Sequence, residues 1–172
     1  MQGREPRKIP GGASILDHHG LRKLQLIIIA AFFALSIDGK VFSAAPSPII
    51  GTLQRVSGTA AIVRQDQILP AKVGLEIHAN DTLRTGTDGS IGVVFHDDTR
   101  LSLGSGSVLV IDEFVYAPRQ GKLSLIFRMM KGTAVYLSGL IAKLAPDSVL
   151  FVTPSASVGV RGTKFAVKVE ER

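Results

Sequence analysis

The last stretch of the chain restricts its fold more than any other segment. From residue 163 to residue 170 the side chains alternate with a period of two. Lys164, Ala166, Lys168 and Glu170 share one face, and apolar or β-branched residues share the other. This period is that of a β-strand with one buried face. We therefore expect the chain to end in a strand that closes a core. If Phe165 fills that core, Phe165→Ala costs roughly 3 to 5 kcal/mol.

The region before this strand consists of short apolar runs separated by Gly, Asp, Asn, Ser and Pro. No amphipathic stretch is long enough to predict a large helix, so the fold class is all-β. We expect hairpins at Ser57-Gly58 and Asp97-Asp98, and one or two helical turns within 138–145. About ten short strands bury their alternating faces most readily as a β-sandwich of two packed sheets. The expected strands are 51–56, 59–64, 82–84, 90–96, 100–103, 108–111, 123–130, 133–137, 149–153 and 163–169.

The first 45 residues have the organisation of a secretory signal peptide. An uncharged apolar run, 24–37, is shorter than the roughly 20 residues that cross a bilayer as a helix. Arg22 and Lys23 precede it and Ser43-Ala44-Ala45 follows it, which predicts a helical signal segment cleaved after Ala45. Residues 46–50 then form a linker, and residues 51–170 form the β domain. An uncleaved anchor, cleavage nearer Ser36, and a buried helix of the domain are the alternatives.

A segment with two glycines leads into the last strand. Thr153-Pro154 ends the preceding strand, since proline cannot donate to a sheet ladder. Gly159-Val160-Arg161-Gly162 follows, and the glycines predict a backbone with positive φ or close approach at both positions. One interpretation is a recognition loop centred on Arg161. The other is a tight corner whose arginine binds its own loop carbonyls.

Together these residues resemble the C-terminal motif of the FecR domain family. The motif comprises Thr153, Pro154, Gly159, Val160, Arg161, Gly162, Thr163 and Phe165. The resemblance extends from about residue 50 to residue 170 and implies a β-sandwich of jelly-roll character. Two further segments, 80–86 and 93–99, resemble family regions but carry Asn80 and Asp98 where glycine is usual. Asn and Asp tolerate left-handed conformations better than other non-glycine residues, so both departures are physically mild.

The residues that could support chemistry do not form a recognisable site. Cysteine is absent, and the net charge of +6 divides equally between residues 1–45 and the remainder without a basic cluster, so we expect no nucleic-acid partner. His96, Asp97, Asp98 and Asp112 suggest a metal or acid/base cluster, but adjacent aspartates are themselves typical of a turn. His78 stands alone, and no nucleophile, zinc-protease or phosphate-binding motif occurs. We expect no catalytic residue, metal or cofactor.

The resemblance implies signal reception outside the cytoplasm, where FecR-like domains relay a receptor's signal to a sigma factor. Only 23 residues precede the apolar run, fewer than an anti-sigma segment needs, so we expect the extracytoplasmic half alone. The predicted protein is a periplasmic or secreted non-enzymatic module that binds an envelope protein or glycan. Its contact with the membrane is through the N-terminal segment. The alternatives are an inner-membrane-anchored scaffold, and an envelope hydrolase or metal-dependent enzyme that uses His78 or His96.

Overall fold

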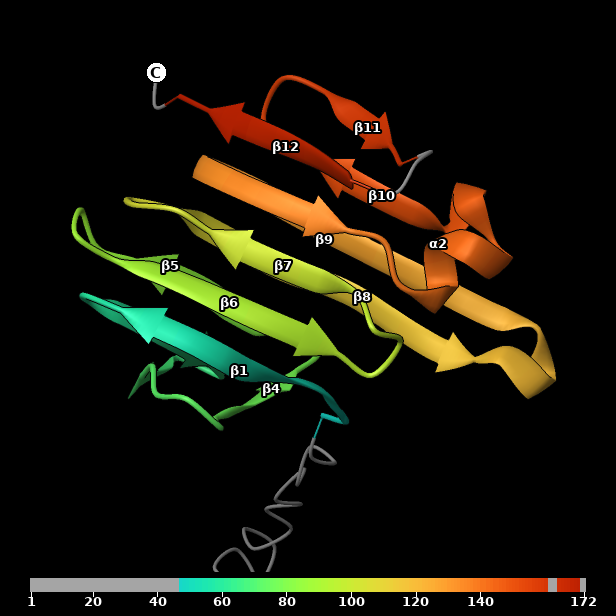
Figure 1. Ribbon diagram of the computed structural model, residues 1–172, viewed down its shortest axis with the longest axis horizontal. Coiled ribbons are helices and arrows are strands. Elements are labelled where there is room, and N and C mark those ends of the chain that lie inside the picture. Colours follow the sequence, from blue (N-terminus) through green and yellow to red (C-terminus); the bar gives the residue numbers. More distant parts are fainter. Residues whose placement is uncertain (1–46, 161–163, 171–172) are drawn as a thin grey trace, which may run out of the picture. The chain divides into compact units, whose positions relative to one another are not determined.

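The computed structural model describes residues 47–160 and 164–170, which are mostly β (Figure 1). Within these two ranges, three short helices interrupt the strands: η1 (Pro118–Gln120), α2 (Leu140–Leu144) and η2 (Pro146–Ser148). The strands are β1 (Ile49–Ser57), β2 (Ala60–Arg64), β3 (Gln67–Pro70), β4 (Glu76–His78), β5 (Thr82–Thr85), β6 (Ser90–Phe95), β7 (Arg100–Leu103), β8 (Val108–Ala117), β9 (Lys122–Leu137), β10 (Val149–Val152), β11 (Ser157–Gly159) and β12 (Lys164–Val169).

The strands form one curled sheet in the order β3-β2-β5-β8-β9-β7-β6-β1-β4, and β10, β11 and β12 attach at β9. Among the described strands, every pairing is antiparallel except that of β9 with β10. The first part of β9 pairs with β8 and β10, and its last six residues pair with β7 and β12. We call β2, β3, β5, β8, β10, β11 and the start of β9 half B. Half A is β1, β4, β6, β7, β12 and the end of β9.

The two parts of β9 meet at Gly132, where the backbone has a φ of 93°. A side chain at this position would collide with the backbone and side chain of Ser107. The buried Ser107 hydroxyl donates to the Gly104 carbonyl at 2.8 Å and accepts from the Thr133 N–H at 3.0 Å. A glycine and a buried serine therefore fix the point at which β9 passes from one half to the other.

The inner faces of both halves enclose a single hydrophobic core. Its centre is a continuous series of aromatic rings. The Phe127 ring lies 5.5 Å from that of Phe95 and 4.9 Å from that of Phe151, and the Phe165 ring lies 4.7 Å from Phe151. Offset and edge-to-face contacts of this kind add to the burial of apolar area. The rings thus join residues from half A and half B across the interior.

The all-β class is confirmed, as are the Asp97-Asp98 hairpin between β6 and β7 and the short helix α2. Two packed sheets were expected, whereas the pairing forms one continuous sheet; the jelly-roll character stays a prediction. The segments 123–130 and 133–137 are one strand, β9, and β3, β4 and β11 were not expected.

The prediction of a hairpin at Ser57-Gly58 is wrong, because β1 and β2 do not pair with each other. β1 pairs with β4 and β6, and β2 pairs with β3 and β5. Gly58, at φ 61°, instead turns the chain from half A to half B.

Asn80 and Asp98 both adopt the left-handed conformation, with φ of 68° and 66°. The two substitutions for glycine are therefore compatible with the fold, as their residue types predict. The predicted signal segment, residues 1–45, lies outside the described residues. Within the described ranges, no helix is long and apolar enough to cross a bilayer.

Candidate functional site

A groove of about 940 Å³ lies between the β10–β11 hairpin and β12. Figure 1 shows these three strands together at one side of the sheet. We call this hollow the edge groove. It is lined by Val108, Met130, Lys131, Thr153, Pro154, Ser155, Ala156, Val158, Val167, Lys168, Val169 and Glu170.

A tight turn with several hydrogen bonds positions the β11 side of the edge groove. The Thr153 hydroxyl accepts from the Ala156 N–H and donates to the Ala156 carbonyl, both at 3.0 Å. The Thr153 N–H donates to the same carbonyl at 2.8 Å. Pro154 lies inside the turn, where its missing N–H costs no ladder bond. Thr153 and Pro154 thus determine how β10 reverses into β11.

Two unpaired strand edges flank the edge groove. Within the described residues, β11 pairs with β10 alone and β12 pairs with β9 alone. The Val160 N–H donates to the Val149 carbonyl at 3.1 Å. Because bonding alternates along an antiparallel strand, the N–H and C=O groups of Ser157 and Gly159 point away from β10. The outer edge of β11 therefore offers free donors and acceptors.

The interior of the edge groove is apolar. Met130 and Val158 are 46% and 42% exposed, which is high for large apolar side chains. Val167 and Val169 on β12 pack against the core but are only half-buried. No described strand covers these side chains between the β11 and β12 edges, so the core is incompletely closed here.

The rim of the edge groove carries an exposed ion pair. Lys168 Nζ lies 2.9 Å from Glu170 Oε1. The hydrogen bond from Lys168 lowers the pKa of Glu170, and the same bond raises the pKa of Lys168. Both side chains are fully solvated, and exposed pairs of this kind contribute little to stability.

The residues of the predicted recognition loop do not all gather at the edge groove. Thr153 and Pro154 line it, and Gly159 lies on β11. Val160 is buried, and Phe165 is half-buried against Phe151 and Tyr136. The remaining three motif residues, Arg161, Gly162 and Thr163, lie outside the described residues, so the role of Arg161 stays a prediction.

The expectation for Gly159 is wrong. Its φ is not positive, and an added side chain would meet nothing within 4 Å. Gly159 belongs to an extended edge strand rather than to a corner, because the turn that reverses β10 into β11 is made earlier by residues 153–156.

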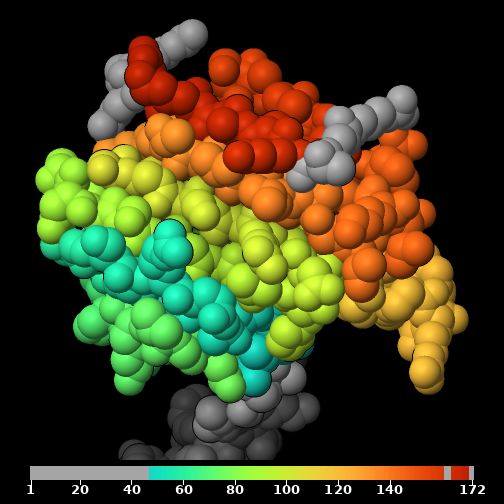
Figure 2. Space-filling model, in the orientation of Figure 1, coloured from blue at the N-terminus to red at the C-terminus, as the bar shows by residue number. Residues whose placement is uncertain are grey.

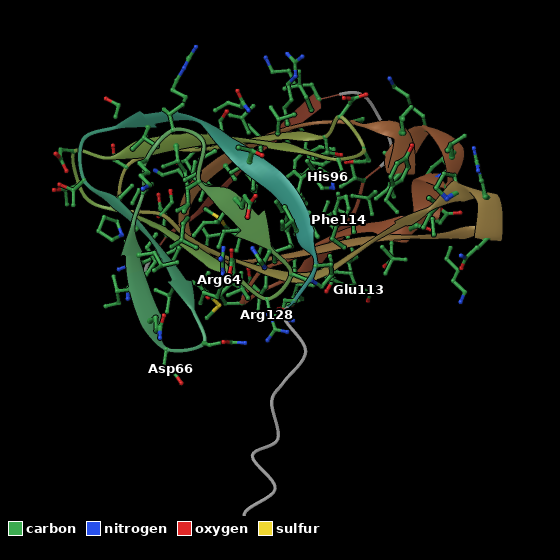
Figure 3. All side chains as sticks on the ribbon, turned by 90° about the horizontal axis from the view of Figure 1, so that it is seen from below. Arg64, Asp66, His96, Glu113, Phe114 and Arg128 are labelled. Atoms are coloured by element: carbon green, nitrogen blue, oxygen red, sulfur yellow. The ribbon has the colours of Figure 1, made fainter. Side chains whose placement is uncertain are left out.

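The histidines and aspartates of the alternative enzyme hypothesis have separate surroundings. His96 is exposed at the end of β6 (Figure 3), whereas Asp97 is fully buried and binds backbone N–H groups. Asp112 pairs with Arg128 at 2.7 Å. His78 Nδ1 lies 2.6 Å from the Ser47 carbonyl. Among the residues that the structure describes, no group of three His, Cys, Asp or Glu side chains is placed to hold a metal ion.

Sequence reasoning missed the apolar lining of the edge groove, in particular Met130 and Val158. A signal for Met130 existed, because Met129 and Met130 are adjacent apolar residues in a strand and therefore point to opposite faces. Val158 stands between Ser157 and Gly159, which made its run look like a loop. The free edges of β11 and β12 depend on the pairing order, which the local pattern does not contain.

Comparison with family models finds a match to the FecR protein family over residues 81–172. Comparisons with curated proteins and with solved structures find no match. The matched region runs from Asp81, immediately before β5, to the end of the chain, and includes β8, β9 and both edges of the edge groove. Because the match covers more than half of the chain, the chain belongs to the FecR family.

Proposed function

We propose that this protein is an exported, non-enzymatic FecR-type module that receives a partner protein in the cell envelope. In this proposal an extended segment of the partner pairs with the outer edge of β11. Its alternate side chains enter the edge groove, where they cover Met130, Val158 and Val167. The family is generally regulatory and typically associated with the envelope, which supports both the location and the non-enzymatic role.

The observation that carries this proposal is the coincidence of unpaired strand edges with uncovered apolar side chains. An exposed edge strand is a template for pairing with another chain, and proteins usually protect such edges. Here the edge of β11 borders an apolar hollow of about 940 Å³. Peptide recognition by strand addition uses this combination, with backbone bonds giving affinity and side-chain pockets giving specificity.

Site-specific crosslinking in cells tests the proposal. A photoreactive residue at Ser155, in the hairpin turn that lines the edge groove, should recover one envelope protein. The same residue at Lys122, exposed at the start of β9, serves as the matched control. Equal recovery from both positions, or no partner above background at Ser155, would contradict the proposal.

Export is tested separately. N-terminal sequencing of the protein from the envelope fraction should begin near Pro46. Resistance to an alkaline carbonate wash, with Met1 retained, would favour the anchored scaffold instead.

For the enzyme alternative, a metal assay and an activity panel on His78→Ala and His96→Ala should show no bound metal and no difference from the unsubstituted protein.

A further inference from the structure

The outer face of half A carries more cations than carboxylates. Its described carboxylates lie at its margins: Glu170 beside Lys168, and Glu76 on β4. The outward side chains of β6, β7, β12 and the end of β9 include Arg100, Lys164 and Lys168 but no aspartate or glutamate. Arg55 of β1 joins them. Lys168 is paired with Glu170, which follows β12. Arg55, Arg100 and Lys164 form no ion pair with any described residue, so this face is available to a negatively charged ligand.

In half B, two arginines are paired with aspartates: Arg64 with Asp81 and Arg128 with Asp112, each at 2.7 Å. Figure 3 labels both arginines. Arg84 on β5 is exposed and forms no ion pair with a described residue. The three unpaired cations on the half A face come from β1, β7 and β12, which are far apart in the chain and close together in the sheet.

The pairing register places a trough of small residues across this face. Gly92, Ser102 and Ala166 lie in one row, with Val135 between the last two and Arg55 at the β1 end. A depression of about 640 Å³ lies over the β6 and β7 part of this row. Figure 2 shows the face in front, with β1, β6, β7, β9 and β12 as successive bands from cyan to red.

The cations along the trough are widely spaced. Arg100 and Lys164 both lie opposite Leu137, one on each side of β9. Since neighbouring strands are about 4.8 Å apart, their backbones are about 10 Å apart, and the trough crosses five strands over roughly 20 Å. A suitable ligand is therefore extended and carries negative charges at intervals comparable with the length of a disaccharide.

This spacing argues against a nucleic acid. Double-stranded DNA carries a charge about every 1.7 Å of its axis, far denser than the cations here, and binding of single strands relies on aromatic stacking. The outward residues of β6, β7, β12 and the end of β9 include no aromatic side chain. Small side chains and hydroxyl groups suit the close approach of sugar rings instead.

We propose that the outer face of half A binds an acidic polysaccharide whose sugars carry carboxylates. Arg100 and Lys164 hold carboxylates of successive repeats through charge-assisted hydrogen bonds. The row of Gly92, Ser102 and Ala166 lets the sugar rings lie close to the sheet. Apart from Lys168, which borders both, this surface shares no residue with the lining of the edge groove. The protein can therefore hold the polysaccharide whether or not the edge groove binds a protein.

Binding of uronic acid oligosaccharides by the purified full chain tests this inference. A uronic acid oligosaccharide with one carboxylate per disaccharide, such as a hyaluronate oligomer, should bind. Its affinity should fall with added salt, and the carboxyl-reduced oligosaccharide should bind at least about tenfold more weakly. The double variant Arg100→Gln/Lys164→Gln should lose about tenfold or more in affinity, because it removes both charge-assisted hydrogen bonds to the carboxylates.

Two further variants make the test specific. Gly92→Thr fills the trough without removing charge and should also weaken binding. The fold should accept this substitution, because an added Cβ meets only the Arg55 and Ser102 side chains, at 3.4 and 4.0 Å. Lys122→Gln/Lys143→Gln removes two exposed cations that lie off this face and should leave affinity unchanged. Unchanged binding by the Arg100/Lys164 double variant, equal binding of the reduced oligosaccharide, or tighter binding of single-stranded DNA or polyglutamate would overturn the inference. Matching unfolding curves show that each variant is folded.

Discussion

The carboxylate of Asp97 accepts a hydrogen bond at 3.1 Å from the backbone N–H of Ile141, which lies 44 residues further along the chain. The same carboxylate accepts from the Thr99 N–H at 3.1 Å and from the Thr99 hydroxyl at 2.8 Å. Thr99 in turn accepts from the Gly139 N–H at 3.1 Å. The β6–β7 turn therefore holds the start of α2 in place, and the aspartate of a family motif has a structural role here.

Asp97→Ala should lower the free energy of unfolding by about 3 kcal/mol. The substitution leaves the N–H groups of Thr99 and Ile141 buried without a partner, and each such loss costs roughly 1 to 3 kcal/mol. Urea unfolding measures the change. The control is Asp98→Gly, because Asp98 is exposed and its left-handed backbone accepts glycine; we expect a change within about 1 kcal/mol. Equal effects at the two positions would show that Asp97 does not hold α2.

Gly132→Ala should be more destabilising than Gly106→Ala. Both glycines have positive φ, 93° and 60°, so both variants include the strain of a left-handed alanine, which is about 1 kcal/mol. A side chain at Gly132 also collides with Ser107, whereas at Gly106 it meets nothing within 4 Å. We expect thermal unfolding to show a clear loss for Gly132→Ala beyond that of Gly106→Ala. Similar melting temperatures would mean that the bend of β9 is not fixed by this contact.

The sequence predicts the all-β class and most strands because the alternation that marks a strand is local. Alternation in the last strand is confirmed, with Phe165, Val167 and Val169 less exposed than their neighbours. The left-handed backbones at Asn80 and Asp98 also follow from the residues at those positions. These features depend on a few consecutive residues, which the sequence presents directly.

Features that depend on distant partners could not be predicted in this way. Asp97 and Asp98 look alike as turn residues, but one is buried because a segment 44 residues away folds over it. Ser57-Gly58 has the composition of a hairpin turn but connects strands in different halves. The edge groove lies between β11 and β12, each of which pairs along only one edge within the described residues. No local pattern shows which edges stay unpaired.

Phe165 is half-buried, so its removal should cost less than the 3 to 5 kcal/mol expected of a core phenylalanine. We expect Phe165→Ala to lower the free energy of unfolding by about 2 kcal/mol, from partial burial and its contacts with two rings. Phe151 is fully buried and contacts Phe165, Phe127 and Tyr136. Phe151→Ala should therefore cost about 3 to 5 kcal/mol. A larger loss for Phe165→Ala than for Phe151→Ala in urea unfolding would contradict this order.

Tyr136 should make the fold sensitive to alkaline pH. Burial of its side chain raises the pKa of Tyr136, and the nearby Asp97 carboxylate acts in the same direction, against the hydroxyls of Thr99 and Ser138. Because the pKa of Tyr136 is higher in the folded state, its contribution to the free energy of unfolding is fully present below the pKa of tyrosine in the unfolded chain, about 10. This contribution is lost as the pH rises through the pKa of the folded state. The free energy of unfolding, measured from pH 8 to pH 12, should therefore fall with pH, and the fall should be shallower in Tyr136→Phe. Identical pH profiles for the two proteins would show that Tyr136 does not contribute.

Ser157→Pro should block partner binding while leaving the domain folded. The Ser157 N–H points away from β10, so proline removes a donor from the free edge of β11 and none from the β10–β11 ladder. Val158→Pro is the matched comparison, because the Val158 N–H points towards Phe151 and its loss breaks a ladder bond. With the crosslinking residue at Ser155, Ser157→Pro should reduce recovery of the partner several-fold and leave the unfolding midpoint nearly unchanged. Val158→Pro should lower the unfolding midpoint as well. Full recovery of the partner from Ser157→Pro would exclude strand addition at β11 and direct attention to the edge of β12.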